Sequence, residues 1–249
     1  MVEVAQSMIS NMTRILFDQS LFLRLLANDA AVVAALAVPT PAARITAQAR
    51  LAQLVRQSGY YRNAFVADAH GDIVISVDRN AAVQTHNVSD AAQYGKAMRS
   101  TTADQWYTDE VWRNPWSDNH AVLVYVAGIR PAASEGTPLG VLYLEFDWEG
   151  QIGAIVSDRH LFRAVERDRT VVSVVDDDGR VVATSGGYTF GQALPHDLTG
   201  TRGSVSQGDS VVAFASAVDF HGFDGLKLRC VIERQVSEDP EGGAIGSAA

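Results

Sequence analysis

The sequence is poor in cysteine and in basic residues. Cys230 is the single cysteine among 249 residues, so no disulfide can form within the chain. The 20 Lys and Arg are outnumbered by 29 Asp and Glu, which gives a formal net charge of −9. Because the phosphates of nucleic acids are bound by basic surfaces, this balance excludes a nucleic-acid partner.

Long apolar runs are also missing. The longest uncharged apolar stretch, 30–43, contains Pro39 and Pro41, whereas a bilayer span needs about 20 apolar residues in a row. Glu3 stands where a secretory signal would carry a basic residue, and no long apolar segment follows it, so no signal peptide is predicted. This pattern fits a cytoplasmic protein or a fragment that lies between two membrane helices, with membrane contact only through flanking segments.

Signatures of catalysis and of metal binding are absent from the sequence. The six histidines include no pair spaced three or four residues apart, and one cysteine cannot form a thiolate cluster. The stretch from Asp176 to Gly179 lacks the spacing of a calcium loop, and a turn between two strands explains it better. We therefore predict no catalytic residue, no metal ligand and no cofactor.

The first 59 residues have the pattern of helices. No Gly or Pro occurs between Glu3 and Asn28, and apolar residues recur there at helical spacing. Asn28 or Asp29 can cap a second helix that ends near Leu36, and a third helix is predicted over 42–57, before Gly59. The apolar stripe of the first helix either packs within its own chain or forms the seam of a homodimer.

Beyond Gly59, β-branched and aromatic runs alternate with turn signals. Strands are predicted over 64–68 and 72–78, joined by a turn at Gly71, and over 121–130 and 139–147. A helix capped by Ser89 is predicted over 89–99, and a short helix over 149–158.

The strand pattern then occurs a second time. The sequence Val66-Ala67-Asp68 followed by Gly71 matches Val174-Val175-Asp176 followed by Gly179, a displacement of 174 − 66 = 108 residues. Strands over 211–215 and 225–229 correspond to the later strands of the first copy. The repeat predicts an α+β fold in which a long N-terminal helix carries two small modules, each with an antiparallel sheet.

Aromatic and acidic residues gather in the first module. Three of the four tryptophans lie between 106 and 116, next to Tyr107 and Asp109, and Tyr94 precedes them. Such rings supply flat apolar walls for a small ligand, and carboxylates orient it and select positive charge. The same rings can instead seal the open face of a sheet whose core is thin.

The chain resembles the double Cache (dCache) sensor domains of bacterial chemoreceptors, histidine kinases and diguanylate cyclases. The matching segments are the long leading helix, Tyr60 to Asp68 before a Gly turn, Pro138 to Trp148, Val174 to Ser185 and Gly225 to Glu233. The resemblance implies two tandem PAS-like modules on a long helix: a stalk over 1–59, a membrane-distal ligand-binding module over 60–158 and a membrane-proximal module over 159–236. The Gly- and Ala-rich segment 237–249 is predicted to be a flexible tail.

The resemblance also implies where a ligand binds and what it lacks. The amino-acid-binding members carry an Arg-x-Trp-Tyr motif whose last residue falls on Tyr94, and Ala91 stands at the position of the arginine. Since alanine cannot pair with an α-carboxylate, we predict a neutral or cationic ligand, with Arg99, Arg113 or Arg130 as the alternative route to an anion. The predicted ligand-binding residues are Tyr94, Trp106, Tyr107, Asp109, Trp112, Tyr125 and Asp147.

These observations lead to a functional expectation with alternatives. The leading hypothesis is the periplasmic ligand-binding domain of a methyl-accepting chemotaxis protein, which binds a small molecule and transmits a conformational signal. The alternatives are a sensor domain of a histidine kinase or diguanylate cyclase, a cytoplasmic soluble sensor, and a ligand-free module for dimerisation through the N-terminal helix. A small hydrolase or isomerase is the least favoured class.

Overall fold

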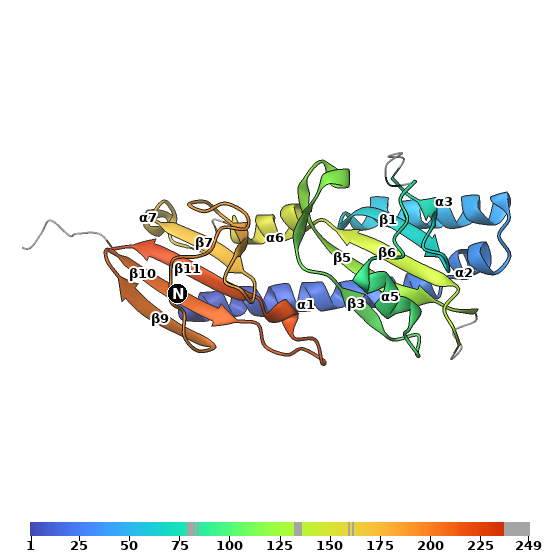
Figure 1. Cartoon of the computed structure of the whole chain (residues 1–249). Helices are drawn as coiled ribbons and strands as arrows, with labels where there is room; N and C mark the ends of the chain where they lie inside the picture. Colours follow the sequence, from blue (N-terminus) through green and yellow to red (C-terminus); the bar gives the residue numbers. More distant parts are fainter. Residues whose placement is uncertain (79–82, 84, 132–135, 159, 161, 237–249) are drawn as a thin grey trace, which may run out of the picture. The chain divides into compact units, whose positions relative to one another are not determined.

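The structure is a computed structural model that describes residues 1–78, 83, 85–131, 136–158, 160 and 162–236 (Figure 1). It has the predicted α+β fold, with a long N-terminal helix followed by two antiparallel sheets. The described residues form two compact units. The first unit comprises Met12–Ala154 and Phe220–Gly225, and the second comprises Met1–Asn11, Ile155–Asp219 and the described residues from Leu226 onward. The predicted tail, 237–249, lies outside the described residues.

Three helices precede the first strand, as predicted. They are α1 (Val2–Ala27), α2 (Ala30–Ala37) and α3 (Pro41–Ser58). Asp29 caps α2 by accepting a hydrogen bond from the Ala31 amide at 2.9 Å, and α3 ends at Gly59, whose φ of 65° is left-handed. Among the described residues, no helix alone is long and apolar enough to cross a bilayer; α1 and α2 meet that criterion only as a pair, bent by 52°.

The sheet of the first unit has six strands. Its central path runs in the order β2-β1-β6-β5-β3, and β4 pairs with β5. The strands are β1 (Tyr61–Asp68), β2 (Ile73–Ser76), β3 (Trp106–Thr108), β4 (Trp112–Asn114), β5 (His120–Ile129) and β6 (Gly140–Phe146). A short 3-10 helix, η1 (Pro115–Ser117), follows β4, and α6 (Trp148–Val156) follows β6.

The helix of the first unit, α5, spans Ala92–Met98, so it begins later than predicted. Ser89 does not cap it: the capping position is Ala91, which makes no side-chain hydrogen bond. The preceding residues are instead bound to the β1–β2 turn, since the Val88 amide donates to the Gly71 carbonyl at 2.8 Å. The chain then turns over Ser89 and Asp90, where the Ala91 amide donates to the Val88 carbonyl at 3.0 Å, so the helix begins only at Ala92.

The sheet of the second unit has five strands in the order β8-β7-β11-β10-β9. The strands are β7 (Thr170–Val175), β8 (Val181–Thr184), β9 (Arg202–Gln207), β10 (Ser210–Ser216) and β11 (Arg229–Gln235), and the helix α7 (Ala164–Arg167) precedes β7. The strand predicted over 225–229 is wrong, because Gly225, Leu226 and Lys227 all have positive φ and form the 3-10 turn η4 (Gly225–Lys227). The last strand therefore begins at Arg229.

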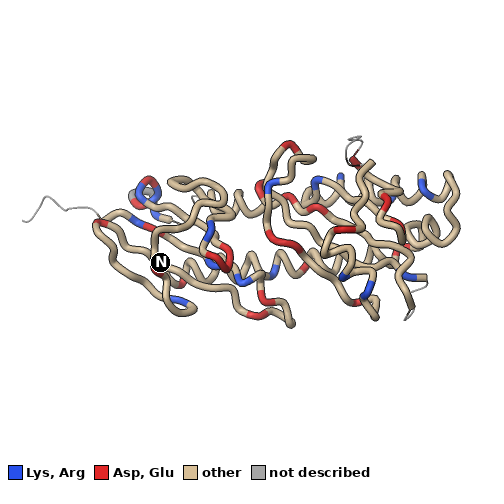
Figure 2. Tube along the Cα trace, in the orientation of Figure 1, with Lys and Arg blue, Asp and Glu red and all other residues tan. Residues whose placement is uncertain are grey.

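The two sheets share the hairpin that the repeat predicted. In the first, the Oδ1 atom of Asp68 accepts from the amides of His70 and Asp72. In the second, Asp176 accepts from the amides of Asp178 and Arg180 in the same way. Each turn thus satisfies its own backbone donors. Acidic and basic residues are interspersed in both units outside the uncharged stretch 30–43 (Figure 2).

The two turns offer a matched pair of substitutions. Gly71 and Gly179 both have positive φ, 85° and 75°, but a Cβ on Gly71 would lie 2.6 Å from the Ser89 nitrogen, whereas a Cβ on Gly179 meets nothing within 4 Å. Gly179→Ala should cost about 1–2 kcal/mol of folding free energy through its left-handed backbone alone. Gly71→Ala should cost about 1–3 kcal/mol more because of the clash. Urea unfolding of both variants measures this, and equal losses would refute the close packing of Ser89 on the turn.

Candidate functional site

The pleat of the first sheet divides its aromatic residues between two faces. Tyr107 pairs with Val126, Val126 with Tyr143, and Tyr143 with Phe65. Paired residues point to the same side of a sheet. These residues therefore share one face, which α5 covers and which we call the α5 face. The neighbouring residues Trp106 and Tyr125 point to the opposite face.

The α5 face is a mixture of apolar and hydroxyl-bearing groups. The rings of Phe65 and Tyr143 are stacked with centroids 4.5 Å apart. Tyr94 of α5 is buried against this cluster, and its hydroxyl donates to the Asp68 carbonyl at 2.8 Å. Tyr107 packs against the same cluster. Tyr94 and Tyr107 are thus the predicted site residues that the fold brings together here.

The opposite face holds Trp106 and Tyr125 in contacts with other parts of the unit. The Tyr125 hydroxyl donates to the Leu16 carbonyl of α1 at 3.0 Å, and its ring lies 5.9 Å from that of Trp106. Trp106 also contacts Phe223, whose ring centroid is 5.5 Å away. The predicted site residues therefore do not all lie on one face, because adjacent strand residues face opposite ways.

Several hydrogen-bonding atoms on the α5 face are buried without a partner in the described part of the chain. They include the Trp112 indole nitrogen Nε1 and the Tyr143 hydroxyl, and also Nε and Nη1 of Arg130, which lies near Gly128 and the Ala97 carbonyl of α5. Trp112 pairs with Val122, which points to the same side of β5 as Val124. Val124 packs against the cluster on the α5 face, so Trp112 lies on this face as well. Burial raises the pKa of Tyr143 well above its usual range, and nearby Tyr94 and Asp109 raise it further. An unpaired buried donor costs about 1–3 kcal/mol, which a bound ligand would relieve.

A carboxylate that the sequence analysis did not single out lies on the same face. Glu145 is buried on β6, and its Oε1 atom accepts hydrogen bonds from Asn114 Nδ2 and, at 2.8 Å, from Ser117 Oγ. Burial raises the pKa of Glu145 above its ordinary value, against the opposing effect of these two donors. The alternation of side chains along a strand could have identified it, because Glu145 is separated from Tyr143 and Val141 by two and four residues and so points to the same side.

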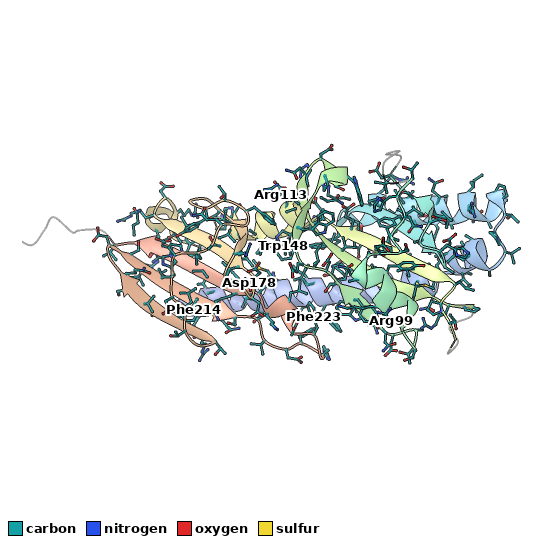
Figure 3. The ribbon with its side chains drawn as sticks, viewed as in Figure 1. Arg99, Arg113, Trp148, Asp178, Phe214 and Phe223 are labelled. Carbon is teal, nitrogen blue, oxygen red and sulfur yellow. The ribbon has the colours of Figure 1, made fainter. Side chains whose placement is uncertain are left out.

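Asp147 and the three candidate arginines have other contacts. The Asp147 carboxylate accepts from the Gly150 amide at 3.1 Å, at the start of α6, and lies 3.6 Å from Arg62. Arg130 is only 1% exposed and donates to the carbonyl and, at 3.0 Å, to the hydroxyl of Ser100. Arg113 donates to the Asn119 carbonyl at 2.8 Å, and Arg99 lies beside Gly95 of α5 (Figure 3).

Within the described ranges, no group of three His, Cys, Asp or Glu side chains is placed to hold a metal ion.

The α5 face combines aromatic rings, unpaired hydrogen-bond donors and a buried carboxylate, an arrangement suited to binding a small molecule.

Comparisons with known proteins place this architecture among sensor domains. No protein-family model and no curated protein matches the sequence. Among solved structures, a domain of a sensory box/GGDEF family protein from Vibrio parahaemolyticus has a TM-score of 0.70 at 15% identity, with 94% of each chain covered. The ligand-binding domain of the Pseudomonas fluorescens chemoreceptor CtaA, in complex with L-leucine, has a TM-score of 0.64 at 14% identity, covering 94% of this chain and 92% of that one.

The sensor domain of the Vibrio cholerae histidine kinase DctB is equally similar, with a TM-score of 0.64 at 14% identity, and covers 94% of this chain and 96% of that one. At these identities the comparisons show the fold. They confirm the predicted likeness to Cache-type sensor domains.

Glu145 gives a prediction on pH. A carboxyl whose pKa is raised by folding destabilises the fold above its unfolded pKa, about 4.3, and this cost disappears as the pH falls below it. Glu145→Gln should therefore be more stable than wild type at pH 7, and the difference should shrink on acidification. Glu149→Gln is the control of opposite sign, since the Ala121 amide and Arg113 lower the pKa of Glu149. Thermal unfolding from pH 4 to 8 measures both, and a Glu145→Gln variant less stable at pH 7 would contradict the assignment.

Proposed function

We propose that this chain is the extracytoplasmic ligand-binding domain of a bacterial transmembrane receptor. Its first unit, the membrane-distal module, binds a small molecule on the α5 face and transmits a conformational signal. The observation that carries this proposal is the pair of buried, unpartnered groups, Trp112 Nε1 and the Tyr143 hydroxyl, on the same face as Glu145. The fold shared with sensor domains supports it.

The charges around the face favour a neutral or cationic ligand. Asp109 is close enough to Tyr143 to raise its pKa, and Glu145 lies two residues from Tyr143 on the same face of β6. CtaA was crystallised with L-leucine and with L-serine, which both carry an α-carboxylate. Here Ala91 stands where the resemblance places an arginine. Arg130 donates to Ser100 through Nη2, and its buried Nε and Nη1 atoms, which have no partner in the described part of the chain, are the remaining route to an anion. We therefore do not expect general recognition of α-amino acids.

The receptor class proposed is a methyl-accepting chemotaxis protein. Sensor domains of a histidine kinase and of a GGDEF protein share the fold, so these classes are the alternatives.

The second proposal is that the chain forms a homodimer through α1. This helix exposes three large apolar side chains: Leu21 (45%), Phe22 (41%) and Leu25 (69%). Each proposal can hold without the other.

The test of ligand binding uses paired substitutions on the two faces. A panel of amines, polyamines and neutral polar compounds is screened by thermal shift, and positive compounds are measured by calorimetry. Tyr143→Phe and Trp112→Phe should each weaken binding by about tenfold, the loss of about one hydrogen bond. The controls Tyr125→Phe and Trp106→Phe lie on the opposite face and should leave the affinity unchanged. Without ligand, Tyr143→Phe should be at least as stable as wild type, since it removes an unpaired hydroxyl.

The outcomes separate the hypotheses. If the controls weaken binding and the α5-face variants do not, the site assignment is wrong. If a common α-amino acid binds tightly and loses its affinity when its carboxylate is amidated, the predicted ligand class is wrong. If no compound binds, the ligand-free dimerisation module is favoured instead.

A further inference from the structure

The two sheets carry a glutamate at the same register position. In the first sheet Ala67, the residue before the turn aspartate, pairs with Val141, and Glu145 lies four residues further along β6. In the second sheet Val175, again the residue before the turn aspartate, pairs with Arg229, and Glu233 lies four residues further along β11. Glu233 is therefore the equivalent of Glu145, on the equivalent face of its sheet.

Glu233 is occupied by side chains of its own unit. The Tyr188 hydroxyl donates to Glu233 Oε2 at 2.6 Å, and the His196 Nε2 atom lies 3.1 Å from the same oxygen. Both residues come from the connection between β8 and β9, residues 185–201. On the other side of the ring, His196 Nδ1 lies 2.7 Å from Gln207 Oε1 of β9. The His196 side chain is only 7% exposed.

The geometry assigns the imidazole a donor role. Tyr188 uses its one hydroxyl proton on Glu233, so its oxygen can only accept from His196 Nε2, 3.3 Å away. Nε2 thus faces two acceptors and carries a proton. Burial alone would raise the pKa of Glu233, but the hydrogen bonds from Tyr188 and His196 outweigh it and lower that pKa. The result is a planar N–H ring bound to a carboxylate.

The connection that supplies this ring covers the sheet and leaves a small space. Tyr188, Leu194 and Leu198 pack on the core cluster around Val231. A cavity of about 110 Å³ adjoins His196 beneath the connection. It is lined by Val175, Asp176, Asp177, Gly179, Leu194, His196, Leu198, Lys227 and Arg229.

The charged groups near His196 come from several elements. Arg229 of β11 donates to the Leu198 carbonyl and to the Ser216 hydroxyl, and Lys227 lies 2.9 Å from Asp177. Lys227 pairs with Asp177. The carboxylate that contacts the imidazole is that of Glu233.

We propose that this face of the second unit is a binding site for a small nitrogen heterocycle, kept filled by the protein's own 185–201 connection, with His196 as the resident ligand of Glu233. The sheet supplies Glu233 of β11 and Gln207 of β9, and the connection supplies the Tyr188 hydroxyl together with the imidazole that fills the site. Loss of the imidazole would join its volume to the existing cavity and remove one hydrogen-bond partner each from Glu233, Gln207 and the Tyr188 hydroxyl, while the bond from Tyr188 to Glu233 remains. Such a vacancy accepts a free molecule of the same shape and donor pattern.

The test restores the ring from solution. His196→Gly should lower the melting temperature, and imidazole should raise it again in a saturable manner, by more than it does for wild type. Adding Glu233→Gln to His196→Gly should abolish the saturable rise. The matched control is His120→Gly: His120 Nδ1 also lies 3.3 Å from a carboxylate, that of Glu149, but both side chains are exposed. Absence of saturable rescue, or equal rescue of His120→Gly, overturns the proposal.

A second measurement applies if His196→Gly does not fold. Glu233→Gln in the otherwise intact chain should release the connection. Its Gly191 and Leu194 amides, which donate to the Val181 and Gly179 carbonyls, should then exchange hydrogen faster. The Val88 amide of the first unit, bonded to Gly71, should be unchanged. Unchanged exchange at Gly191 and Leu194 would show that Glu233 does not hold the connection. Loss of ligand binding in the first unit would leave both tests unaffected.

Discussion

The alternation of side chains across the pleat of the first sheet determines which residues can form a site. Trp106 and Tyr107 are neighbours in sequence, yet one contacts Tyr125 and Phe223 and the other packs toward Tyr143. A shift of one residue in the β3–β5 pairing would exchange them. The β3–β5 pairing places the apolar contacts of Trp106 on one face, and the β4–β5 and β5–β6 pairings place the unpaired Trp112 and Tyr143 groups on the other.

The duplicated scaffold shows how one position can acquire two roles. Glu145 and Glu233 occupy the same register, but their surroundings shift their pKa values in opposite directions. Glu145 is deeply buried with an amide and a hydroxyl as donors, whereas Glu233 is held by a phenol and an imidazole. Desolvation is the largest single cause at both carboxyls; it outweighs the two hydrogen bonds at Glu145, whereas the combined effects of Tyr188, His196 and Ser210 outweigh it at Glu233.

Much of the fold could be predicted from the sequence, because local chemistry determines it. Asp29 and the two Asp-x-x-Gly turns each satisfy backbone groups near their own position, and Gly59 ends α3 through its left-handed φ. The site was harder to predict, because it depends on pairing between distant strands. Asp147 matches the end of a strand in sequence, yet it caps α6, while Glu145 two residues earlier faces the site. Nor could composition show that Gly225, Leu226 and Lys227 turn left-handed before the last strand.

The central claim is that molecular recognition occurs on the α5 face of the first sheet. The indole N–H signals of the four tryptophans in a ¹⁵N-labelled sample test it most directly, during titration with pooled amines and neutral polar compounds. We expect the Trp112 signal to shift, because its Nε1 gains a hydrogen-bond partner, and the Trp106 signal to stay in place. A shift of the Trp106 signal with an unchanged Trp112 signal would show that the ligand does not bind on the α5 face.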